Sequence, residues 1–225
     1  LLKRSTGEIN GFVVEMPTAG GHNAPPRGAM QLNELGEPIY GKKDEVKFEQ
    51  IKKLGLPFWL AGEFGTPEGL QRALDVGATG IQVGTAFAYC NESGMEPETR
   101  QEIINQVLEG DISVRTDPLV SPTGFPFKVV QLDGTIADPN LYEERDRICD
   151  LGYLRQIYAT PDGKIGYRCA SEPIKDYLKK GGKEEDTVGR GCLCNNLGAA
   201  AGFPQVRKDG FVEPAIVTSG DTLPT

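Results

Sequence analysis

Residues 11–23 have the sequence GFVVEMPTAGGHN, an apolar run that ends in a proline and is followed by two glycines and a histidine. A short apolar run bounded by turn residues is typical of a buried β-strand. We therefore expect a strand over 11–16 and a loop at its carboxyl end. His22 is the single histidine of the 225 residues, so any imidazole chemistry at neutral pH must use it.

The same pattern recurs further along the chain. Residues 57–61 (PFWLA) and 80–84 (GIQVG) are short apolar runs that meet glycine at their ends. Helical patterns separate the three runs, with an apolar stripe over 44–54 and a Thr-Pro start for a helix over 66–76. Strands that alternate with helices predict a parallel sheet, with any site at the carboxyl ends of its strands.

The glycines at these strand ends suggest two kinds of contact. Gly20 and Gly21 allow a backbone to approach a flat ligand closely, although a loop histidine bonded to a neighbouring carbonyl is the alternative for His22. The second and third strand ends could hold a phosphate dianion through backbone N–H groups. Simple turn chemistry explains either end alone, but two consecutive ends favour phosphate, as in (β/α)8 barrels. The N–H groups in question belong to Gly62, Glu63, Gly84 and Thr85.

The pattern changes after about residue 115. Residues 116–140 are rich in Pro, Gly and Asp and predict irregular structure. We expect two units, 1–115 and 116–225, the second an irregular α+β extension. Further helices are expected over 97–108, 139–149 and 173–180, and a strand over 127–130.

Four of the five cysteines lie in the second half, separated by 19, 22 and 1 residues. Four thiols can form a tetrahedral site for zinc or an iron–sulfur cluster, although a single residue between the last two is tighter than usual. Buried or free thiols, or a disulfide, are the alternatives. The four candidates are Cys149, Cys169, Cys192 and Cys194.

The composition restricts the partners. There are 24 Lys and Arg against 32 Asp and Glu, a formal charge of −8 that gives no general attraction to nucleic acid or anionic lipid. No apolar run is long enough to cross a bilayer, and the first residues do not read as a signal sequence. We expect a cytoplasmic protein that acts on a small molecule and binds neither nucleic acid nor membrane.

Three stretches resemble one family closely. Residues 14–23, 57–64 and 73–87 are similar to the last three strands of the nitronate monooxygenases, also called 2-nitropropane dioxygenases. The resemblance covers residues 8–110. It implies an α/β fold, the last three strands of an FMN-binding (β/α)8 TIM-type barrel, followed here by the extension.

The resemblance also implies a chemistry. His22 would be the catalytic base of an FMN-dependent enzyme that oxidises nitronates or nitroalkanes with oxygen. Glu63 departs from the family, which has a second glycine there, and the run after His22 departs as well. A flavin-dependent enoyl reductase of the same superfamily and a non-catalytic metal-binding or assembly module are the alternatives. The cofactor-binding residues would be Gly20, Gly21, Gly62, Glu63, Gln82, Gly84 and Thr85.

Three parallel strands cannot close a barrel, and the open sheet edge needs a cover. We therefore expect the chain to be the carboxyl-terminal part of a longer enzyme. The alternative is a half barrel that another chain completes, either as a homo-oligomer or as a separate amino-terminal half.

Overall fold

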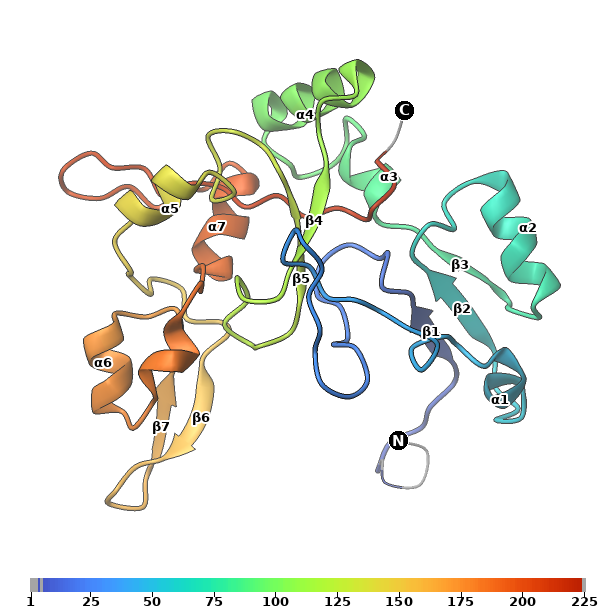
Figure 1. The fold of residues 1–225 in the computed structure, drawn as a ribbon, viewed down its shortest axis with the longest axis horizontal. Coiled ribbons are helices and arrows are strands. Elements are labelled where there is room, and N and C mark those ends of the chain that lie inside the picture. Colours follow the sequence, from blue (N-terminus) through green and yellow to red (C-terminus); the bar gives the residue numbers. More distant parts are fainter. Residues whose placement is uncertain (1–3, 5, 224–225) are drawn as a thin grey trace.

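The computed structural model describes residues 4 and 6–223, and it contains the expected parallel sheet (Figure 1). Its strands are β1 (Phe12–Glu15), β2 (Phe58–Ala61) and β3 (Gly80–Gln82), in the order β1-β2-β3. The register pairs Val14 with Leu60, and Leu60 with Ile81. All three carboxyl ends therefore lie at one edge of the sheet, which confirms the prediction from the sequence.

Two helices connect these strands. In α2 (Pro67–Asp75) the Thr66 hydroxyl accepts a hydrogen bond from Gly69 N, so the predicted cap and first-turn proline are confirmed. The other helix, α1 (Phe48–Lys52), is shorter than the predicted 44–54. Asp44 explains the late start, because its carboxylate accepts hydrogen bonds from loop amides and the loop continues past it.

The chain after β3 contains α3 (Thr85–Ala88), which was not predicted, and α4 (Pro97–Glu109), which was. The Glu96 carboxylate caps α4 by accepting hydrogen bonds from the amides of Glu98 and Thr99. Gly110 ends it in the left-handed conformation.

The second half contains more regular structure than its composition predicts. The strand expected over 127–130 is confirmed, but it pairs with a strand that was missed. The helix expected over 139–149 ends at Glu144, because Arg145 is extended and its guanidinium is buried. The elements are β4 (Val114–Asp117), β5 (Phe127–Val130), α5 (Pro139–Glu144), β6 (Gln156–Ala159), β7 (Ile165–Arg168), α6 (Ile174–Lys179), the 3-10 helix Glu184–Thr187 and α7 (Leu193–Ala200).

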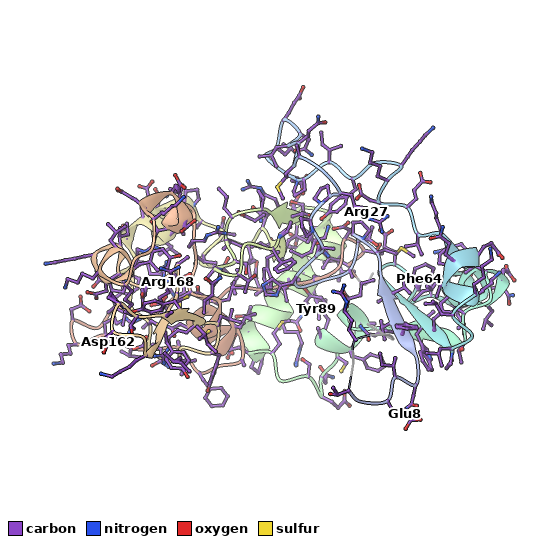
Figure 2. The ribbon with its side chains drawn as sticks, turned by 90° about the horizontal axis from the view of Figure 1, so that it is seen from below. Glu8, Arg27, Phe64, Tyr89, Asp162 and Arg168 are labelled. Atoms are coloured by element: carbon purple, nitrogen blue, oxygen red, sulfur yellow. The ribbon has the colours of Figure 1, made fainter. Side chains whose placement is uncertain are left out.

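Many contacts cross residue 115. Asn23 N donates to Pro126 O at 2.8 Å and Lys128 N donates to Gly21 O at 2.9 Å, so β5 lies against the loop after β1. A buried cluster that includes Tyr89 joins α4, β5 and the segment near residue 217. Figure 2 shows Tyr89 in the middle of the molecule, between the parallel sheet and the part that carries Arg168.

Glu213 organises the interior of the second half. Its carboxylate accepts hydrogen bonds from Arg145 at 3.3 Å and from Arg207 at 2.6 Å, and its side chain is fully buried. Two guanidinium groups therefore form ion pairs with one buried carboxylate.

We predict that Glu213→Ala lowers the free energy of unfolding by about 3–5 kcal/mol, the range for removing one partner of a buried ion pair. Arg145 would then keep its buried charge without its carboxylate. Urea unfolding measures the difference, with Glu143→Ala on the exposed side of α5 as the control. Equal unfolding midpoints for the two variants would contradict this role.

Candidate functional site

A pocket of about 620 Å³ lies at the carboxyl ends of β1, β2 and β3. The loops 18–21, 62–66 and 82–86 line it, together with most of residues 218–223, which we call the strap. All seven of the cofactor-binding residues predicted from sequence contribute to the lining. These are Gly20, Gly21, Gly62, Glu63, Gln82, Gly84 and Thr85.

The glycines of this pocket have different structural roles. Gly62 has φ +94°, and a Cβ there would come within 2.6 Å of Thr18 Oγ1, so backbone conformation and close packing both require glycine. A Cβ on Gly20 would lie 2.8 Å from the carbonyl carbon of Ser219, in the strap. A Cβ on Gly84 would meet no described atom within 4 Å. Gly84 therefore leaves its side of the pocket open to a ligand.

Glu63 keeps the backbone conformation of a glycine. Its φ is +59°, which makes it the single non-glycine with positive φ in the part of the chain that the structure describes. Its side chain is exposed and accepts a hydrogen bond from the Thr222 hydroxyl at 2.9 Å. Glu63 thus brings backbone strain and a carboxylate to the edge of the pocket.

The pocket can hold an anion through its backbone. None of the described residues that line it is a lysine or an arginine, and Glu15 and Glu63 add negative charge. The cap of α2, Thr66, belongs to the lining, and the positive end of the helix dipole favours an anion there, although Pro67 lacks an N–H and Gly69 N is bonded to the Thr66 hydroxyl. A phosphate in this pocket would therefore be held by uncharged donors, the loop amides that the sequence predicts together with the hydroxyls of the lining.

His22 lies next to this pocket, outside its lining, at the junction with the second half. Its Nε2 is 2.7 Å from Ser121 Oγ, and its ring contacts Phe127 edge to face at 4.8 Å between centroids. Partial burial lowers the pKa of His22 below its usual 6.5. The neutral imidazole is therefore favoured at pH 7, with one ring nitrogen held by Ser121 and the residue exposed to solvent.

Ser121 was not identified from the sequence. It is fully buried, and its Oγ lies 2.7 Å from Thr123 Oγ1. The two hydroxyls therefore continue the hydrogen-bonded chain that starts at His22 Nε2. Ser121 is 99 residues away from His22 in the chain. The sequence around it, SPTG, signals only a turn.

The four cysteines of the second half do not form the predicted metal site. Among residues 4 and 6–223, no group of three or more His, Cys, Asp or Glu side chains is placed to hold a metal ion. All five cysteines are free thiols. Burial, with smaller contributions from neighbouring thiols, raises the pKa of Cys149, Cys169 and Cys192, the last to about 11. Burial thus disfavours the thiolate form that zinc requires.

The described part of the chain has no helix long and apolar enough to span a bilayer. The fold and the pocket define an α/β protein with a ligand site at the carboxyl ends of parallel strands, next to one histidine.

Comparison with known proteins identifies the family. The family model described as nitronate monooxygenase matches residues 5–117. The chain therefore belongs to the nitronate monooxygenase family, an expectation from sequence that is confirmed. It is 34% identical over 104 residues to a protein of Bacillus subtilis (strain 168) named "Probable nitronate monooxygenase". The match covers 46% of this chain and 28% of that relative.

We predict that Glu63→Gly stabilises the chain by about 1 kcal/mol, because glycine accepts a positive φ without strain. Glu63→Gln is the matched control, since it keeps the strain and removes only the charge. Thermal unfolding provides the measurement. A Glu63→Gly variant no more stable than Glu63→Gln would contradict the backbone strain inferred from the positive φ of Glu63.

We predict that the imidazole C–H signals of His22 titrate in NMR with a midpoint below 6.5, and that the urea-unfolded chain titrates near 6.5. The folded state then binds fewer protons than the unfolded state, so this site favours folding fully above pH 6.5 and less as the pH falls toward the folded pKa. A folded midpoint at or above 6.5 would refute the shift. The single histidine makes the assignment direct.

Proposed function

We propose that the chain is part of a flavin-dependent oxidoreductase that oxidises nitronates or nitroalkanes with oxygen, with His22 as the base. The observation that carries this proposal is the position of His22, next to a glycine-lined pocket at the strand ends and bonded to Ser121 at 2.7 Å. Family membership supports the reaction class.

The chain's own groups would have distinct roles. Nε2–H of His22 would donate to Ser121 Oγ, which leaves Nδ1 with the lone pair that takes the α-proton of a nitroalkane. Ser121 would position the ring. Its Oγ would still accept the hydrogen bond from Nε2–H after Nδ1 has taken the proton and the ring is charged. A neutral imidazole suits a base at pH 7, and the lowered pKa of His22 keeps it neutral.

The pocket would hold FMN by its phosphate end. The loop amides after β2 and β3 and the N-terminus of α2 would contact the phosphate, with Gly84 leaving room for it. FMN, when bound, would accept the electrons of the substrate and deliver them to oxygen. The chain's part is to orient the substrate carbon between His22 and the ring.

We propose further that the sheet belongs to a (β/α)8 barrel. The strand order, the parallel pairing and the site at the carboxyl ends support this arrangement. The remaining strands would come from elsewhere in the protein or from a partner chain. The substrate would be a small molecule.

We predict that His22→Ala lowers nitroalkane turnover by about 10² or more, since the substrate must lose a proton before oxidation. Turnover of the preformed nitronate, which needs no base, would fall much less. Steady-state oxygen consumption with both substrates measures the two losses in the complete enzyme.

Ser121→Ala is the companion variant. It would reduce nitroalkane turnover while retaining a pH profile set by His22, because the base remains. Equal losses on both substrates in His22→Ala would show that His22 positions the substrate. If the enzyme reduces an enoyl thioester and turns over no nitronate, the proposed reaction is wrong and the enoyl reductase is the better assignment.

A further inference from the structure

The strap, residues 218–223, ties together the loops that follow all three parallel strands. Gly21 N donates to Thr218 Oγ1 at 2.8 Å, after β1. The Thr222 hydroxyl donates to Glu63, after β2, at 2.9 Å. After β3, Gly220 N donates to Thr85 Oγ1 at 2.9 Å.

The strap packs backbone to backbone on the pocket rim. The missing side chain of Gly20 leaves room for it, since a Cβ there would lie 2.8 Å from the Ser219 carbonyl carbon and 2.9 Å from Gly220 N. A Cβ on Gly220 would in turn come within 3.1 Å of Thr18 O and of Thr85 Oγ1. Two glycines from distant parts of the chain therefore face each other at this contact.

An ion pair fixes the strap to β5. Lys128 is buried, and its Nζ donates to Asp221 Oδ1 at 2.5 Å and to Thr116 Oγ1 at 2.7 Å. Asp221 N also donates to Thr18 O at 3.1 Å. Because Lys128 Nζ has little contact with solvent, its attraction to Asp221 is weakly screened.

The strap leaves the pocket open. Thr218, Ser219, Gly220, Thr222 and Leu223 all line the 620 Å³ pocket, together with loops 62–66 and 82–86. That volume lies within the range of pockets that bind cofactors. The strap is therefore a wall of the pocket, and it does not fill it.

We propose that the strap is part of the ligand-binding site: a wall, fastened by the Lys128–Asp221 pair, that makes the pocket retain FMN. The inference rests on the proposed flavin site and assigns new roles to two residues in it. These residues are Gly21 and Thr85, which would hold the strap in place. The Gly21 amide donates to the Thr218 hydroxyl, and the Thr85 hydroxyl accepts from the Gly220 amide.

Two variants detach the strap without removing it, and both are tested in the complete enzyme, with the rest of the barrel present and FMN as the probe. Asp221→Asn weakens the fastening to Lys128, and Asp209→Asn, at an exposed turn, is its control. Gly20→Ala pushes the strap away, and Gly41→Ala, where a Cβ meets no described atom within 4 Å, is its control. A third variant ends after Val217.

We expect the Kd for FMN, from quenching of flavin fluorescence, to rise at least about tenfold in Asp221→Asn and Gly20→Ala, roughly the effect of one charge-assisted hydrogen bond. The shortened chain should lose more, and the controls should match the parent. Amide hydrogen exchange at Gly21 and Gly220 should quicken in the same variants, which shows that the strap has detached.

Three results would overturn the proposal. An unchanged Kd with quickened exchange would mean that the strap is not a wall of the site. A tighter Kd in the shortened chain would make the strap a competitor of the ligand. If the parent enzyme with its complete barrel binds no FMN, the proposed flavin site fails and this inference fails with it, whereas the first two results leave the flavin site intact.

Discussion

The structure depends on the short backbone pairing between residues 21–23 and 126–128. Asn23 N donates to Pro126 O, and Lys128 N donates to Gly21 O, so His22 and Phe127 face each other as a bridge. This pairing attaches the second half to the end of β1. It also fixes the histidine, because the ring then packs on Phe127 and reaches Ser121.

The same pairing determines where positive charge is available. Lys128 follows Phe127 on β5, so the pairing brings a buried ammonium close to the strand ends. Asp221 neutralises that charge, and the lining of the pocket adds two carboxylates, Glu15 and Glu63. An anion in the pocket would therefore be held by uncharged donors, the amides and hydroxyls of the lining, which agrees with a chain of net charge −8.

Local signals in the sequence predicted the first half well. Alternating apolar runs and glycines located β1, β2 and β3, and the start of α2 followed from Thr66 and Pro67, because caps and strand ends depend on neighbouring residues. The pocket then followed from topology, since parallel strands place their carboxyl ends at one edge.

Contacts between distant residues could not be predicted in this way. Ser121 lies 99 residues from His22, and Thr218 lies 197 residues from Gly21, so no local pattern connects either pair. The helix α7 was missed because its Gly198 and paired asparagines are poor helix formers, and burial stabilises it instead. The spacing of the cysteines predicted a metal site, but their order in the chain contains no information about the direction of each thiol.

The glycines show why a motif alone does not define a ligand contact. Gly62 is required by its own φ and by Thr18, and Gly20 by the strap, whereas Gly84 is required by neither. Two of the three are thus explained by packing within the protein. Packing among the described residues does not require glycine at Gly84, which lines the pocket with open space around its Cβ position, so a ligand has room to approach the backbone there.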